Sequence, residues 1–188
     1  VALTGTPAIQ ARLRRPLIDL GARPVSLMTT QGVEQEISFH WSLLAQEPNW
    51  VVLTSQNGVE CFFRALDRAG VDLRALAPCR FAVIGPARIS ADLCPEVHTT
   101  QGLAGALLER LSPGEPVRLF RSQLGSRELY RRLSERFPVE DVPLYALRPD
   151  NTDPAVLQAR LEEADYLLLS SASGGDFLLD TGVTLPPC

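Results

Sequence analysis

The sequence predicts an α/β fold with two similar halves, each built on a parallel sheet flanked by helices. In the segment 50–63, a short apolar run ends in a turn of small polar residues, and apolar residues at helical spacing follow. The segment 166–179 repeats this pattern and aligns with the first without a gap. Apolar agreement alone is common among strand–helix units. The matched hydroxyl pair, and Gly174 aligned with Gly58, make this repeat more specific.

The polar turns of the two repeats are the first candidate binding sites. Parallel strands end at one edge of a sheet, where backbone N–H groups at helix starts and nearby hydroxyls bind anionic ligands. A single hydroxyl can equally serve only as a helix cap, so the interpretation as a site depends on the group. The candidates are Thr54, Ser55, Asn57 and Gly58 in the first turn, and Ser171 and Ser173 in the second.

The N-terminal part of the chain predicts two strands and a helix between them. Residues 1–4 form a short apolar strand, and Thr6 followed by Pro7 is typical of a helix start. Pro16 lies inside this helix and should kink or split it. A second strand is expected at 24–28.

Two further segments connect the halves. The segment 29–38 is interpreted as a crossing linker, and a helix at 41–46 leads from it into the first repeat. The segment 142–149 is extended and bracketed by prolines, which predicts a second crossing linker. A helix at 153–161 then leads into the second repeat.

The middle of the chain predicts more strand–turn units with candidate binding groups. The strand at 81–84 ends in Gly85, which allows the backbone to come close to a ligand. Thr100 is the expected cap of the next helix. The strand at 117–120 leads into a turn whose candidates are Arg121, Gly125, Ser126 and Arg127. For the two arginines, ligand binding and a purely structural role are equally good interpretations.

The charged residues exclude several classes of chemistry. The net charge of −4 and pI of about 5.2 argue against a general nucleic-acid binder. All 18 basic residues are arginine, so Schiff-base chemistry and a lysine-containing phosphate loop are excluded. Arginine is also the residue best suited to bidentate carboxylate binding.

Metal and membrane functions are not indicated either. The two histidines, His40 and His98, are far apart in the sequence, which makes a metal site improbable. No apolar run approaches membrane-spanning length and no signal peptide is recognised, so we expect a cytoplasmic protein. The cysteines fit buried thiols of a reducing compartment; they are Cys61, Cys79, Cys94 and Cys188.

Five segments together resemble the uroporphyrinogen-III synthase family. The strand WVVLTSQNGVECFF is similar to that family's most recognisable segment. The other four follow in the family's order and cover nearly the whole chain. They are FAVIGPARISADL, VRLFRSQLGSRELYRRL, VPLYALRP and YLLLSSASGGDFLL.

The resemblance implies two α/β lobes joined by a two-stranded linker, with the active site in the interdomain cleft. One lobe would be discontinuous, from 1–28 plus 152–188, and the other continuous, from 39–140. The linkers would be 29–38 and 141–151. The chain stops where the second half's next strand would begin, so we expect the discontinuous lobe to be incomplete at its C-terminus.

The activity implied by the resemblance is closure of the linear tetrapyrrole hydroxymethylbilane to uroporphyrinogen III, with inversion of the terminal pyrrole and loss of water. It needs no cofactor. Tyr145 matches the linker tyrosine that the family offers as the acid assisting loss of the hydroxyl, although a buried aromatic hinge is an equally good interpretation. The family also implies a monomer that could receive its substrate from the preceding pathway enzyme.

Two departures keep a second function open. The family usually has arginine where this chain has Gly5, and often threonine where it has Arg88. The alternative is a non-catalytic, two-lobed regulatory module that binds a small anion or a tetrapyrrole without converting it.

Overall fold

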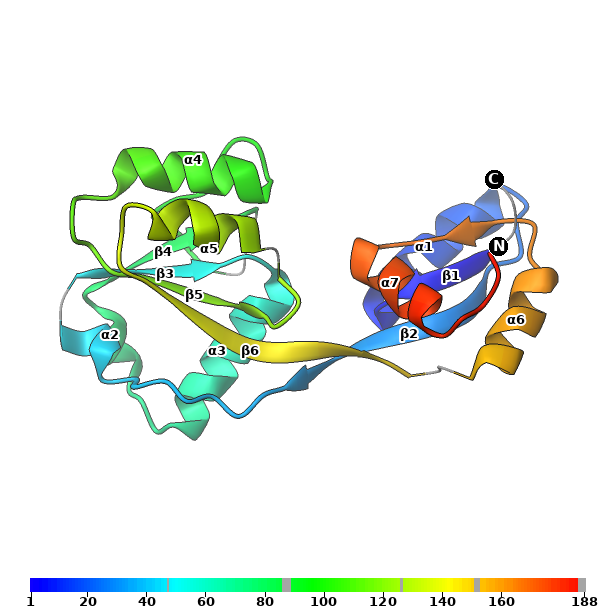
Figure 1. Cartoon of the computed structure of the whole chain (residues 1–188), viewed down its shortest axis with the longest axis horizontal. Coiled ribbons are helices and arrows are strands. Elements are labelled where there is room, and N and C mark those ends of the chain that lie inside the picture. The colour runs from blue at the N-terminus through cyan, green and yellow to red at the C-terminus, as the bar shows by residue number, and fades with distance from the viewer. Residues whose placement is uncertain (47, 86–88, 126, 151–152, 186–188) are drawn as a thin grey trace. The chain divides into compact units, whose positions relative to one another are not determined.

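The computed structural model describes residues 1–46, 48–85, 89–125, 127–150 and 153–185 (Figure 1). Its residue contacts divide the chain into two compact units. Unit 1 comprises Val1–Gly32 and Leu147–Cys188, and unit 2 comprises Val33–Ala146. Each unit has its own set of parallel strand pairs and its own cluster of buried side chains. Among the described residues, no helix is both long and apolar enough to cross a membrane.

Unit 2 is built on a parallel sheet in the order β4-β3-β5-β6. These strands are β3 (Asn49–Leu53), β4 (Cys79–Val83), β5 (Val117–Ser122) and β6 (Val139–Pro149). β3 is buried along its whole length, as its unbroken apolar run predicted. Because β3 pairs in parallel with β4 and β5, and β5 with β6, the carboxyl ends of β3, β4 and β5 lie at one edge.

Helices cover both faces of this sheet. On one face, α4 (Thr100–Arg110) and α5 (Arg127–Ser134) pack leucines against alternate side chains of β3 and β5. On the other face lie α3 (Gln56–Arg68) and the short α2 (Leu43–Gln46), as Figure 1 shows. A 3-10 turn, η1 (Leu73–Leu76), follows α3.

An aromatic cluster fills the α3 face. Phe62 of α3 packs at 4.8 Å, centroid to centroid, against Phe120 of β5. The ring of Trp41 stacks on Phe120 at 5.7 Å, nearly parallel to it. Trp50, on β3, belongs to the buried cluster on the opposite face. Both tryptophans of the chain therefore lie in unit 2.

Unit 1 has a smaller parallel sheet in the order β2-β1-β7. Its strands are β1 (Ala2–Gly5), β2 (Val25–Glu34) and β7 (Leu167–Leu168), and its helices are α1 (Pro7–Asp19), α6 (Pro154–Glu162) and α7 (Ala172–Asp180). Leucines of α6 and α7 pack with Ala2, Leu27 and Met28 in the core of this unit.

The two halves of the α1 prediction have different outcomes. Thr6 caps α1 and Pro7 is its first residue, as predicted. The expectation that Pro16 splits the helix is wrong, because α1 runs without interruption to Asp19. Pro16 has no N–H to donate to the carbonyl four residues earlier in the helix. Because Pro16 is exposed, water can bond that carbonyl instead.

A second correction concerns the start of α4. Thr99, and not Thr100, is the N-cap, and its hydroxyl accepts a 3.0 Å bond from the N–H of Gly102. Thr100 is the first helical residue. The two threonines are adjacent in the sequence, which alone could not tell them apart.

Much of the two segments interpreted as linkers is β-strand. β2 extends through Glu34, and β6 extends from Val139 through Pro149. Within unit 1, the N–H of Asp150 donates to the carbonyl of Thr29 at 2.8 Å. Within unit 2, the N–H of Gln35 donates to the carbonyl of Leu144 at 3.0 Å.

Candidate functional site

The carboxyl edge of the unit 2 sheet brings together candidates from two separate stretches of sequence. Thr54 and Ser55 follow β3, and Gly85 lies just beyond β4. All three line a cavity of about 150 Å³ that extends between the ends of these strands. The sequence predicted this neighbourhood because parallel strands end at a common edge.

Ser55 fixes the start of α3. Its side chain accepts a 2.9 Å hydrogen bond from the N–H of Gly58, which makes it the N-cap. A Cβ on Gly58 would lie 3.1 Å from Ser55 Oγ, so glycine permits this close approach. Asn57 is exposed on the first turn of the same helix.

Tyr145 comes to this edge from β6. Its hydroxyl lies 3.0 Å from the hydroxyl of Ser55, and its side chain is almost fully buried. Burial raises the pKa of Tyr145, since the phenolate would lose its hydration, while the Ser55 hydrogen bond acts in the opposite direction. The net effect is a raised pKa, so the phenol keeps its proton at neutral pH.

The Ser55–Tyr145 contact was not foreseen, although each residue was a candidate alone. The two residues are 90 positions apart in the sequence. Their meeting depends on the register of β5 and β6, in which Ser122 is opposite Tyr145 after an irregularity next to Arg121. A register shift of this kind leaves no periodic signal in one sequence.

The β5–α5 turn holds candidates that differ in their surroundings. Arg121 is buried and forms a bidentate ion pair with Asp141, with Nε–Oδ1 and Nη2–Oδ2 distances of 2.7 and 2.5 Å. A Cβ on Gly125 would lie 2.7 Å from Nη1 of Arg121, so the turn is folded over this guanidinium. Arg127 is exposed at the start of α5. Ser126 lies outside the described residues.

Unit 1 repeats the capping geometry at the start of α7. The hydroxyl of Ser171 accepts a 3.2 Å hydrogen bond from the N–H of Gly174, the counterpart of the Ser55–Gly58 bond. Ser173 Oγ lies 3.2 Å from Ser171 Oγ. The two predicted hydroxyls of the second repeat are therefore neighbours.

The structure gives a physical reason for Gly5. Its φ is +115°, a conformation that side chains rarely adopt. A Cβ at this position would lie only 2.1 Å from Ser170 Oγ. Any side chain at position 5 would therefore be strained, and the side chain of Ser170 would have to move aside. The other departure, Arg88, lies outside the described residues.

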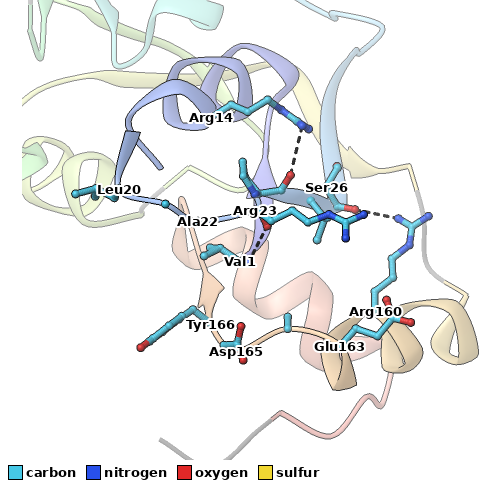
Figure 2. Close-up of a pocket in the computed structure, with 14 residues that line it drawn as sticks. Val1, Arg14, Leu20, Ala22, Arg23, Ser26, Arg160, Glu163, Asp165 and Tyr166 are labelled. Atoms are coloured by element: carbon cyan, nitrogen blue, oxygen red, sulfur yellow. Dashed lines mark hydrogen bonds between the residues drawn. The ribbon is translucent and has the colours of Figure 1, made fainter. Parts of the chain in front are cut away.

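A larger cavity, of about 1010 Å³, lies elsewhere in unit 1 (Figure 2). It is lined by residues at or next to the starts of all three strands, among them Val1, Val25 and Tyr166. Figure 2 shows Arg160 at its margin, donating to the carbonyl of Ser26 at 3.0 Å. The cavity therefore lies at the amino edge of the sheet. None of the residues that line it was a site candidate, and its larger volume alone does not identify it as the functional site.

Three of the four cysteines fall within the described residues and are free thiols. Cys61 is buried, Cys79 is half-buried and Cys94 is exposed. In the described part of the chain, no three His, Cys, Asp or Glu side chains gather as a metal site would require.

Comparison with known proteins identifies a family that this chain matches. The family model for uroporphyrinogen-III synthase HemD matches residues 11–182. The chain is also 28% identical, over 171 residues, to the porphyrin biosynthesis protein HemD of Ruminiclostridium josui. That alignment covers 84% of this chain and 34% of the relative, so the chain spans about a third of the relative's length.

Solved structures show the same fold. A mutant uroporphyrinogen III synthase from Thermus thermophilus superposes with a TM-score of 0.65 at 19% identity, covering 96% of this chain and 77% of that one. The wild-type Thermus enzyme gives a TM-score of 0.57 at 20% identity, covering 96% and 76%. Both share the mixed α/β architecture with a mostly parallel, helix-flanked sheet. Because the family model covers most of its length, the chain belongs to the uroporphyrinogen-III synthase family.

Proposed function

We propose that this chain converts hydroxymethylbilane to uroporphyrinogen III, inverting the terminal pyrrole and releasing water. Family membership supports this activity. The structural observation that carries the proposal is the Ser55–Tyr145 hydroxyl pair, because it offers a protonated phenol beside a cavity at the carboxyl edge of a sheet.

In this mechanism Tyr145 is the general acid. The substrate hydroxyl takes the phenolic proton and leaves as water, while the pyrrole nitrogen supplies the electron pair that forms the protonated azafulvene. The substituted α-carbon of the terminal pyrrole attacks this electrophile to give a spiro intermediate, and the bond from that carbon to its original methylene bridge then breaks. The freed methylene bonds to the other α-carbon of the same pyrrole, which closes the ring with that pyrrole inverted. The proton lost from this second carbon restores the phenol. The electron pair that expels the hydroxyl comes from the pyrrole of the substrate itself, so the proposed reaction needs no cofactor.

The substrate carries eight carboxylates, and the polar turns are proposed to hold some of them. Backbone N–H groups and hydroxyls at helix starts suit this task. The proposed contacts are Thr54, Asn57, Gly58, Gly85, Gly125, Ser126, Arg127, Ser171 and Ser173. Arg121 is proposed to act less directly, by fixing the turn that carries Gly125 and Arg127, since its guanidinium is paired with Asp141.

Ser55 has two proposed roles. It caps α3, and it orients the phenol of Tyr145 through their hydrogen bond. We therefore assign Ser55 to positioning the acid as well as to substrate binding. Fixing an acid in the right geometry is a large part of how enzymes lower barriers.

We also propose that the domains are 1–28 plus 152–188, and 39–140, joined by 29–38 and 141–151. The two compact units, Val1–Gly32 with Leu147–Cys188 and Val33–Ala146, support this division. A monomeric, cytoplasmic enzyme that could accept substrate from the preceding pathway enzyme is part of the same proposal.

The second candidate, a binding module without turnover, is favoured by one observation. Gly5 stands where the family usually has arginine, and a side chain there would be strained, so one expected carboxylate-binding group is absent from that position. The two functions differ in product. The protein is incubated with enzymatically generated hydroxymethylbilane, and the porphyrin isomers are separated after oxidation. Type III product supports the synthase, whereas type I alone supports the module.

A further inference from the structure

The segment between β4 and α4 holds His98 in a defined place. Leu93 forms a parallel bridge with Ala82 of β4, and its carbonyl accepts a 2.9 Å bond from the N–H of Val83. At the other end, Thr99 caps α4. His98 lies in the short stretch between these two anchors, so its position is fixed from both sides.

The ring of His98 packs on Gly85. A Cβ on Gly85 would lie 3.6 Å from both Cγ and Nδ1 of the imidazole. Gly85 also lines the cavity that Thr54 and Ser55 line. A single residue without a side chain therefore separates the imidazole from the candidate site.

His98 is available to an outside anion. Its side chain is exposed, and its Nε2 lies 4.0 Å from Sγ of Cys94. No described carboxylate forms an ion pair with it, although Asp92 and Glu96 are on the same segment. The carboxylate of Asp92 instead accepts the N–H of Phe81 at 2.7 Å.

The small size of the cavity means that groups beyond its walls must also contact the substrate. It has a volume of about 150 Å³, whereas pockets for drug-sized ligands are roughly 300–1,000 Å³. A tetrapyrrole held at this edge must extend past the cavity and meet neighbouring side chains. At the same edge the buried guanidinium of Arg121 is already paired with Asp141.

We propose that His98 is a substrate-binding residue that holds a carboxylate of the tetrapyrrole beside the Thr54–Ser55–Gly85 cavity. This inference rests on the proposed function. When protonated, imidazole is a cation with two N–H donors, and its hydrogen bond to a carboxylate is charge-assisted.

The test compares His98→Gln and His98→Lys with the wild type. Loss of one charge-assisted bond should raise the KM of His98→Gln about tenfold, with a smaller effect on kcat. His98→Lys, which keeps a cationic N–H donor at this position, should retain a low KM. His40→Gln and Cys94→Ser are the matched controls and should leave KM unchanged.

A binding measurement separates this inference from the proposed activity. Uroporphyrin III carries eight carboxylates and can be titrated calorimetrically without turnover. Weaker binding by His98→Gln, restored in His98→Lys, supports the site even if the wild type forms no type III product. Unchanged KM and unchanged uroporphyrin III binding in His98→Gln, with an active wild type, would overturn it.

Discussion

The hydroxyl of Ser55 lies 3.0 Å from that of Tyr145, so the residue that caps α3 also contacts the proposed acid. One oxygen thereby links the start of a helix to a side chain of β6. A change at Ser55 should affect both helix stability and the reaction, and the two effects can be separated.

Tyr145→Phe should be the most damaging single change to turnover. Removal of one general acid costs about 10²–10⁴-fold in rate. Some type III product should remain, because positioning of the substrate survives. The measurement is kcat together with the isomer ratio. If Tyr145→Phe left kcat unchanged while a serine variant abolished turnover, the chemistry would depend on the serine hydroxyl instead.

Ser55→Ala and Ser171→Ala form a matched pair. Each removes an equivalent cap from the two repeats, so each should lower the free energy of unfolding by about 0.5–2 kcal/mol. Ser55 contacts the hydroxyl of Tyr145, and Ser55→Ala should therefore reduce kcat more than Ser171→Ala or Thr54→Ala. In the Tyr145→Phe background the extra loss in Ser55→Ala should vanish. Equal kcat values for the two serine variants would contradict the positioning role.

The raised pKa of Tyr145 predicts an effect on stability at alkaline pH. The folded state holds the phenolic proton more tightly than the unfolded chain, so this stabilisation is complete below the ordinary tyrosine pKa of about 10. It should be lost as pH rises through the pKa of the folded state. Urea unfolding, followed by circular dichroism between pH 8 and 11, should show a steeper decline for wild type than for Tyr145→Phe. Parallel declines would mean that Tyr145 titrates as in the unfolded chain.

Gly5→Ala should be more destabilising than Gly21→Ala. Both glycines have positive φ, but a Cβ at position 5 meets Ser170 Oγ at 2.1 Å, whereas nothing lies within 4 Å of one at position 21. Backbone strain alone costs about 1–3 kcal/mol, and Gly5→Ala adds the clash. Thermal unfolding of both variants checks the difference, and Ser170→Gly should rescue Gly5→Ala in part. Equal losses would show that the clash relaxes freely.

The sequence alone could predict the parallel strand–turn–helix units because each depends on local pattern. β3 and the Ser55 cap of α3 arise from one continuous stretch. By contrast, Arg121 could not be assigned before its pairing with Asp141 was visible, since that ion pair depends on the packing of two strands. His98 was missed for a similar reason, because its position depends on how the segment after β4 folds back on that strand.

The placement of Trp41 and Trp50, both within residues 33–146, has a spectroscopic consequence. Indole emission reports on unit 2 alone, whereas far-ultraviolet circular dichroism reports on helices in both units. If the units melt separately, the two signals will give different midpoints on one heated sample. The chain thus carries its own domain-specific fluorophores, without labelling or mutation.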